Sequence, residues 1–336
     1  MFRVTTEEGS MTSNVDAHVS TMQLGAGTDA FAIASRIVSL VSRFRRMSVE
    51  ALCANQSCQR CEAPHLATAE RIIARGERLE FALPGFPAKS PNLRKVLGIF
   101  PDEAERRALL FLDDLCRQIQ TIYEPGARVL ICSDGRVFGD YVGIEDEHIT
   151  AYQDRLAEML SPFETLSAFN LDDKWSGLSF DVMRDLLTEQ YADGEEETRR
   201  AVKEDDDTRR LYLGMSRFLF EDQKGRFDES NRTLQNRAKE RAYGVIRRSK
   251  AWGKLVSEQF PDALRLSIHP QACGSAKMGI RLGTTPDAWL TPWHSAAVKI
   301  GDGFQLMKRH EAEAAGARVV QVRGENSYLT FDDVAY

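Results

Sequence analysis

A short proline-rich stretch combines a stiff backbone with several cations. Pro84, Pro87 and Pro91 fix the backbone over residues 84–91 and remove hydrogen-bond donors, so this segment is predicted to be a rigid loop. Residues 79–83 are of strand length and apolar except for Glu80, which indicates a short buried strand and places the loop at a strand exit. The polar groups in and after the loop are Lys89, Ser90, Arg94 and Lys95. Phosphorylated ligands bind at such exits in open α/β sheets, so we expect these residues to bind a substrate anion.

A second strand exit offers a carboxylate beside another cation. Residues 128–132 form an apolar run that is followed by Ser133, Asp134, Gly135 and Arg136. A glycine directly after an aspartate suits a turn with positive φ, and it leaves the neighbouring polar side chains facing a crevice. We expect Ser133 and Arg136 to bind substrate. Asp134 would titrate near neutral pH if it were desolvated.

Two histidines add groups that titrate near neutral pH without any perturbation. Residues 264–268 alternate as a strand does and lead into His269, and a turn of small residues after it contains Lys277. His294 closes the segment 291–294. A single histidine is more often structural, but two at strand ends can meet in one crevice and act as acid and base. Lys277, like Arg136, could bind a carboxylate.

These segments, in this order, resemble the isocyanide (isonitrile) synthase family of the PvcA and IsnA type, also called the pyoverdine/dityrosine biosynthesis protein family. The likeness is closest to its PvcA branch. It rests on GFPAKSPN at 85–92, KVLG at 95–98, YEPGA at 123–127, SDGRVF at 133–138, Asp140, SIHP at 267–270, Lys277, GI at 279–280 and TPWH at 291–294.

The resemblance implies an enzyme that joins the α-amino group of an aromatic amino acid to the ketone carbon of ribulose 5-phosphate, which becomes the isocyanide carbon. L-tyrosine is the expected amine donor, ahead of L-tryptophan. No cofactor is implied, and a downstream oxygenase is expected in the same pathway. Imine formation, carbon–carbon cleavage and phosphate loss all move protons, for which we expect His269, His294 and Asp134 to act. The residues leave open whether Lys89 or Lys277 first forms a Schiff base with the sugar.

The same residue types leave two other functions open. A phosphosugar isomerase or aldolase-type enzyme would use these cations without an amine cosubstrate. A non-catalytic α/β module would use them only to bind anionic metabolites. Turnover of ribulose 5-phosphate alone would identify the first, and tolerance of histidine loss would identify the second.

Composition narrows the choice of partners. A net charge of −6 disfavours nucleic acid, because a phosphate backbone demands a basic surface. No apolar run is long enough to span a bilayer, and Glu7 and Glu8 make the N-terminus unlike a signal peptide. We therefore expect a cytoplasmic protein that acts on small molecules and does not bind a membrane.

Four residues near the N-terminal end have the spacing of metal ligands. Four, two and three residues separate Cys53, Cys58, Cys61 and His65, so one tetrahedral ion could reach all of them. Structural zinc sites usually join two segments, however, and these four lie in one. We expect no catalytic metal, and a structural zinc ion at these residues stays open.

The periodicity of the chain predicts the elements that position these groups. Residues 102–123 have the pattern of an amphipathic helix, and short strands are expected around 264–269, 296–300, 304–307 and 318–322, with a helix over 309–315. Apolar residues recur at helical spacing from 179 to 258. The prediction is a loose extension at 1–27 and a single catalytic domain at 28–330. Its fold would be an α/β, Rossmann-like sheet with flanking helices and a mostly helical insertion at 179–258 over one edge.

Overall fold

Parallel strands form the central sheet of this computed structural model, in the order β3-β2-β1-β4-β5. They are β1 (Leu79–Gly85), β2 (Ala127–Ser133), β3 (Leu166–Phe169), β4 (Leu264–Ser267) and β5 (Met278–Gly279). The structure describes residues 15–47, 53, 58–226, 228–284 and 290–331. The chain moves outward from β1 to β2 and β3 and then returns to the other side of β1, so the strand order reverses between β1 and β4. This topology confirms the predicted Rossmann-like α/β fold, in which ligands bind where the order reverses.

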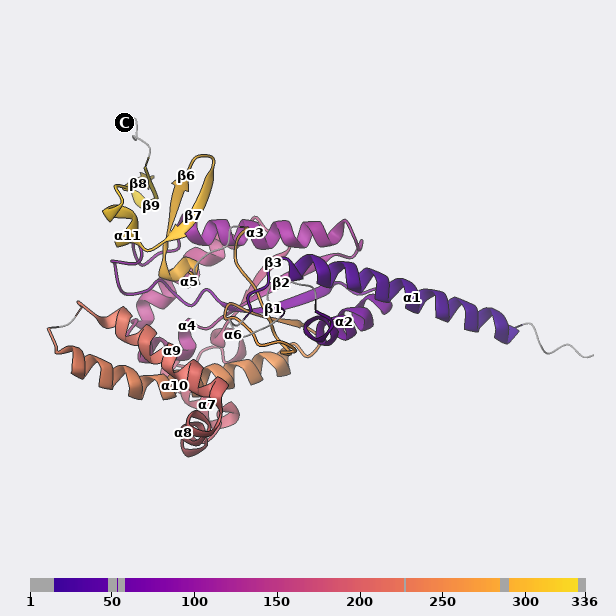
Figure 1. Cartoon of the computed structure of the whole chain (residues 1–336), viewed down its shortest axis with the longest axis horizontal. Helices are drawn as coiled ribbons and strands as arrows, with labels where there is room; N and C mark the ends of the chain where they lie inside the picture. Colours follow the sequence, from indigo (N-terminus) through magenta and orange to yellow (C-terminus); the bar gives the residue numbers. More distant parts are fainter. Residues whose placement is uncertain (1–14, 48–52, 54–57, 227, 285–289, 332–336) are drawn as a thin grey trace, which may run out of the picture.

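One face of the sheet packs against helices from the first half of the chain. These are α1 (Val15–Ser42), α2 (Gln59–Ala74), α3 (Glu103–Gln120) and α5 (Asp146–Leu160), shown in Figure 1. Side chains alternate between the faces of a strand, so Leu79, Phe81 and Leu83 of β1 join this core while Ala82 joins the core on the opposite face. Coverage of both faces explains why the run 79–83 is apolar at every position except Glu80, whose carboxylate pairs with Arg128 of β2.

The opposite face is covered by α4 (Gly135–Val142), α6 (Leu171–Lys174), α7 (Phe180–Tyr191) and α10 (Asn231–Gln259). The segment predicted to be helical is present as α7, α8 (Glu195–Glu204), α9 (Asp206–Gln223) and α10. It covers more than one edge, because α10 packs on Ala82 of β1 and Leu130 of β2 as well as on the edge strand β3, where Trp252 stacks on Phe169 at 5.6 Å between ring centres. The Trp252 indole N–H also donates to the carbonyl of Cys132 (3.4 Å). Burial of these apolar groups holds the insertion against a face of the sheet.

The strands after residue 295 form a second sheet and do not extend the first. Its order is β7-β6-β9-β8, from β6 (Ala296–Ile300), β7 (Gly303–Met307), β8 (Arg318–Val322) and β9 (Glu325–Thr330), with α11 (Arg309–Ala314) between β7 and β8. Ile300 pairs with Gly303 across a two-residue turn, which enforces antiparallel pairing. The Asn326 amide donates to the carbonyl of Leu97 (3.1 Å), so this sheet contacts the segment that follows the proline-rich loop.

The first helix begins within the segment 1–27 that is predicted to be a loose extension. Residues 15–27 are part of α1, which runs out beyond the rest of the molecule in Figure 1, and residues 1–14 lie outside the described part of the chain. Its inner half packs through Ala30, Ala34, Ile37 and Val41 at helical spacing, and the backbone ladder continues outward from this anchored part. Within the described ranges, no helix has the length and apolar character needed to cross a membrane.

Candidate functional site

Four segments that are distant in sequence meet at the carboxyl end of the parallel sheet. The Ser133 hydroxyl, at the end of β2, donates to the carbonyl of Phe86, which follows β1 (2.9 Å). The backbone N–H of Ser90 donates to the carbonyl of Trp293 in the 3₁₀ turn η1 (Pro292–His294) at 2.8 Å. A Cβ on Gly85 would lie 3.1 Å from the Trp293 ring and 3.6 Å from Ile268, which follows β4. The predicted strand exits therefore form one candidate active site.

A glycine permits the close approach of the first two strand exits. A Cβ at Gly135 would lie 2.0 Å from the carbonyl oxygen of Pro87. Phe86, although not a glycine, has φ of 53° and is fully buried against Trp293, with ring centres 5.2 Å apart. The loop is therefore held by its contacts as well as by its prolines.

His294 lies at the end of η1 and is surrounded by protein. Its Nδ1 is 3.0 Å from the Thr291 hydroxyl, and its ring meets the edge of Phe218 at 4.7 Å. Burial lowers the pKa of His294 to about 4, although the carboxylate of Asp222 opposes the shift. The ring is thus neutral near pH 7 and can accept a proton from a bound substrate.

His269 follows β4 and is exposed to solvent. The surrounding protein nevertheless desolvates the ring and lowers its pKa, and the nearby charges of Arg46 and Lys277 act in the same direction. The charge of His269 in turn lowers the pKa of His294, so the two imidazoles lie within electrostatic reach of each other.

Asp134 occupies the end of β2 and the position before the first turn of α4. Burial raises the pKa of its carboxyl to about 7. Its Oδ1 is buried and has no hydrogen-bond partner among the residues that the structure describes. A carboxyl group in this state exchanges a proton near neutral pH, as the sequence analysis required of it.

Lys89 has a complete set of protein partners. Its ammonium lies 2.9 Å from Asp102 and 2.7 Å from Glu105, and it donates to the carbonyl of Pro292 at 3.0 Å. Burial disfavours the charge, but the two carboxylates outweigh burial and raise the pKa of Lys89. All three donors of the ammonium are used, and this geometry makes Lys89 a tie between the loop, the start of α3 and η1.

Ser90 and Lys95 both contact one buried carboxylate in the helical insertion. The Ser90 hydroxyl donates to Oδ1 of Asp222 at 3.0 Å, and the Lys95 ammonium is paired with the same oxygen. The Asn92 amide donates to the carbonyl of Glu221 (3.1 Å). The last turn of α9 therefore closes over the proline-rich loop and brings Asp222 close to His294.

Arg136 is likewise held inside the protein. Its guanidinium donates to the carbonyl of Asp146 (2.8 Å) and the hydroxyl of Thr150 (2.7 Å), and it covers the ring of Phe180 at 3.6 Å. Burial lowers the pKa of Arg136. These contacts join α4 to α5 and α7, which favours a structural role over substrate binding.

The cations beside β4 differ, because no carboxylate in the described part of the chain pairs with them. Lys277 is exposed, and desolvation together with the charge of Arg265 lowers its pKa. Two guanidinium nitrogens of Arg265, Nε and Nη2, are buried without a hydrogen-bond partner among the described residues.

Arg94, which follows the proline-rich loop, has an exposed side chain. Its backbone carbonyl accepts from the N–H of His310 (2.8 Å) beside the second sheet.

Sequence reasoning missed several residues of this site. Phe218 is one of the apolar residues that recur at helical spacing in 179–258, a pattern that predicts a packed helix and not a site residue, and no local signal marks Asp222. Arg265 sits inside a predicted strand, where an arginine between apolar residues was the available clue. Arg46 donates to the carbonyls of Ile268 (2.8 Å) and Leu290 (3.0 Å) and so holds the segments that carry both histidines.

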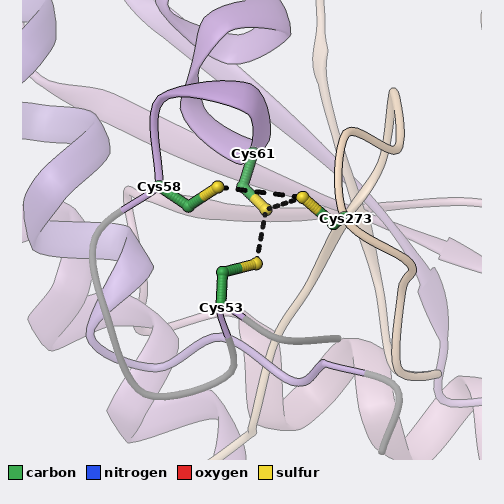
Figure 2. A group of neighbouring side chains, drawn as sticks. All are labelled: Cys53, Cys58, Cys61 and Cys273. Atoms are coloured by element: carbon green, nitrogen blue, oxygen red, sulfur yellow. Dashed lines mark hydrogen bonds between the residues drawn. The ribbon is translucent and has the colours of Figure 1, made fainter. Parts of the chain in front are cut away.

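The predicted metal-ligand set is corrected by the structure. Cys53, Cys58 and Cys61 do gather, but the fourth member of the group is Cys273 (Figure 2). His65 is buried beside Ile37, Phe81 and Leu266 in the core under the sheet, where desolvation lowers its pKa. His65 lies on the buried face of α2, together with Ala69, Ile72 and Ile73, and therefore points toward the core.

Comparisons with known proteins identify relatives of this chain. A family model described as "Pyoverdine/dityrosine biosynthesis protein" matches residues 69–320. The chain is 47% identical over 280 residues to the L-tyrosine isonitrile synthase of Pseudomonas aeruginosa, covering 80% of this chain and 84% of that protein. It is 43% identical over 310 residues to the L-tryptophan isonitrile synthase AmbI2 of Fischerella ambigua, covering 91% and 94%.

A solved structure extends the likeness to three dimensions. The crystal structure of PvcA from Pseudomonas aeruginosa superposes with a TM-score of 0.85 at 43% identity, over 89% of this chain and 100% of that one. The family model spans most of the chain, and the relatives match it nearly end to end. The resemblance drawn from the strand-exit motifs is thereby confirmed, and the chain belongs to the pyoverdine/dityrosine biosynthesis protein family.

Proposed function

We propose that this protein is an isonitrile synthase that converts the α-amino group of an aromatic amino acid to an isocyanide. The observation that carries the proposal is the meeting of the segments that carry Asp134, His269 and His294: Ser133 binds Phe86, Ser90 binds Trp293, and Gly85 approaches both Trp293 and Ile268. Groups of this kind suit a reaction in which nearly every step transfers a proton. The names of relatives at 43–47% identity support the same activity.

Ribulose 5-phosphate is the proposed carbon donor. The substrate amine attacks its ketone carbon, and loss of water gives an imine. Proton shifts, cleavage of both carbon–carbon bonds of the former ketone carbon, which releases the rest of the sugar, and loss of phosphate then follow. Asp134, which holds a proton near pH 7, suits protonation of the leaving hydroxyl, and His269 and His294 suit removal of protons from carbon and nitrogen. An oxygenase that acts on the isocyano acid is the proposed next enzyme of the pathway.

Lys277 is the proposed cation for a substrate anion. It is exposed beside His269 and has no described carboxylate partner, and the unpaired nitrogens of Arg265 add positive potential nearby. A lowered pKa also keeps a Schiff-base role for Lys277 open, whereas the ion pairs of Lys89 count against that role for Lys89. Substrate binding by Ser90, Arg94, Lys95, Ser133 and Arg136 stays a prediction.

L-tyrosine is proposed as the preferred amine donor and L-tryptophan as the alternative. The overall likeness to the tyrosine enzyme motivates this order, although a tryptophan enzyme matches over more of the chain. Only a buried partner for the phenol hydroxyl would discriminate strongly between the two rings. Competition between the amino acids in one reaction gives the ratio of kcat/KM directly.

One incubation tests the activity. Purified protein is mixed with ribulose 5-phosphate and each aromatic amino acid in turn, and an isocyano acid is sought by mass spectrometry. Ribulose 5-phosphate labelled with ¹³C at its ketone carbon should place the label in the isocyanide. Turnover of the sugar phosphate without an amine would instead indicate an isomerase or aldolase, and binding without turnover would indicate a non-catalytic module.

A further inference from the structure

Four thiols from two distant parts of the chain converge on one point. Cys53, Cys58 and Cys61 come from the segment before and at the start of α2, and Cys273 comes from the loop between β4 and β5 (Figure 2). Cys273 is 212 residues beyond Cys61 in sequence. Structural zinc sites usually join two segments of the chain, and the spacing in the sequence offered only one. Cys273 supplies the second segment.

The sulfur atoms have the spacing of a single tetrahedral ion. Cys61 Sγ lies 3.4 Å from Cys53 Sγ and 3.5 Å from Cys273 Sγ, and Cys58 Sγ lies 3.7 Å from Cys273 Sγ. A zinc–sulfur bond of about 2.3 Å in a tetrahedron places neighbouring sulfur atoms about 3.8 Å apart. All four atoms lie within 4.8 Å of one another, which leaves room for one ion and none for a multi-iron cluster.

The alternative of a disulfide does not account for the group. A disulfide joins two sulfur atoms at about 2.05 Å and would leave the other two thiols without a reason to be there. All four cysteines are free in the structure. Cys61 has two sulfur neighbours at nearly equal distance, as a ligand in a tetrahedron has and as a member of a disulfide does not.

The backbone around the thiols is arranged to hold them. Cys58 is the residue before the first turn of α2, and its carbonyl accepts from the N–H groups of Cys61 (2.9 Å) and Glu62 (3.0 Å). Gly274, directly after Cys273, has φ of 82°, so the loop turns sharply beside the first turn of α2. On the third side, the Arg45 guanidinium donates to the carbonyl of Cys53. Each ligand is thus positioned by a hydrogen bond or a turn of its own.

We propose that Cys53, Cys58, Cys61 and Cys273 bind one structural zinc ion. Four thiolates select soft ions in tetrahedral geometry, and four protein ligands leave no position open for a substrate or water. The ion clips the start of α2 to the β4–β5 loop, four residues after His269 and four before Lys277. Its role is to fix the loop that carries those two groups, and its presence does not depend on the proposed activity.

Metal analysis of the full chain tests the proposal without any activity assay. Protein produced in zinc-supplemented medium and purified with a phosphine reductant is expected to hold about one zinc per chain by plasma mass spectrometry. Cys273→Ser and Cys58→Ser should reduce the content at least tenfold. The matched control is Cys116→Ala, since Cys116 is buried in α3 away from the group.

Cobalt binding by the wild-type protein tests the proposal even if a cysteine variant fails to fold. Wild-type protein stripped with a chelator and titrated with Co²⁺ should develop thiolate-to-metal charge-transfer absorption and the visible bands of a tetrahedral tetrathiolate, saturating at one equivalent. Zinc should then displace the cobalt and raise the melting temperature. The proposal is overturned if wild-type protein takes up no stoichiometric metal, if Cys273→Ser retains wild-type zinc, or if iron occupies the group in protein grown with both metals.

Discussion

The loops that follow β1 and β4 border the same site, yet they treat their charged side chains in opposite ways. In the loop at 86–95, Lys89 pairs with Asp102 and Glu105, and Lys95 pairs with Asp222. In the loop at 268–277, Lys277 is exposed, and no described carboxylate pairs with it. The first loop neutralises its cations internally, whereas the second leaves a cation and an imidazole accessible.

The different treatment of charge indicates that one loop stabilises the site and the other supplies its reactive groups. A buried cation with two carboxylate partners has no donors left for a ligand, so its residue type indicates stability and not binding. A desolvated but accessible group has a lowered pKa and an open side, which is the condition for chemistry. The comparison assigns the β1 loop to the framework of the site and the β4 loop to its chemistry, and mutations at the two loops should therefore have separable effects.

The largest effect is expected from His269→Ala in the β4 loop. Loss of a positioned acid or base should slow isocyanide formation by about a hundredfold to ten-thousandfold, with the free energy of unfolding unchanged because the ring is exposed. His294→Ala should slow turnover similarly. Single-turnover rates and urea unfolding measure the two quantities.

His148→Ala is the matched control for these variants, since His148 is exposed on α5 away from the site. It should leave both the rate and the stability as in the wild type. Near wild-type turnover in His269→Ala would remove this residue from the mechanism. A lower stability at full turnover would reverse the roles assigned to the two loops.

In the β1 loop the expected effect is on stability. Lys89→Met leaves Asp102 and Glu105 buried without their cation, which should cost about 3–5 kcal/mol in the free energy of unfolding. Lys308→Met is the control, because its pair with Glu311 is exposed and should contribute about 0–1 kcal/mol. If Lys89→Met unfolds like the wild type and raises KM instead, Lys89 binds substrate after all.

A smaller effect should follow from Lys277→Ala. Loss of one charged hydrogen bond to a substrate anion, worth about 1.5–3 kcal/mol, should raise KM for one of the two substrates about ten- to a hundredfold. Lys277→Arg keeps the charge and should restore most of the affinity. Loss of kcat in both variants would instead point to a Schiff base on Lys277, and unchanged kinetics in both would exclude it from the site.

The last prediction concerns the pH dependence of stability at Asp134, which changes little for each step in pH. Its pKa in the folded protein is about 7, above the value of about 4 in the unfolded chain, so between these values the folded state binds more protons. Asp134 should therefore lower the free energy of unfolding as pH rises from about 4 to about 7, by at most about 1.4 kcal/mol per pH unit. Asp134→Asn should remove this slope, measured by urea unfolding at several pH values. Identical slopes in the two proteins would place Asp134 in a solvated setting.

The sequence predicted the positions of the site's elements better than their partners. The runs 79–83 and 128–132 became β1 and β2, and the end of each carries the expected polar groups, because strand patterns and the residues just after them are local properties. The four-residue strand β3 (Leu166–Phe169) was missed because it has no β-branched residue, whereas β4, which is equally short, alternates apolar and polar residues.

The contacts that the sequence did not predict are those between residues far apart in the chain. The predicted helix start at residue 102 is present, and Asp102 and Glu105 form a capping box there, but nothing local shows that Lys89 reaches both. Cys273 stands alone in its own segment, so its membership of the thiol group depends entirely on the fold. His65 has ligand spacing in sequence, yet the orientation of α2 turns it into the core.

The last turn of α9 limits how this chain can be recombined with its relatives. Asp222 binds Ser90 and Lys95, and Glu221 binds Asn92, so two segments more than 120 residues apart must match each other. A hybrid that takes residues 179–258 from one parent and the β1 loop from another inherits only one side of each contact. Coupled contacts of this kind are not additive. Functional chimeras should therefore draw both segments from the same parent, whichever parent supplies the rest.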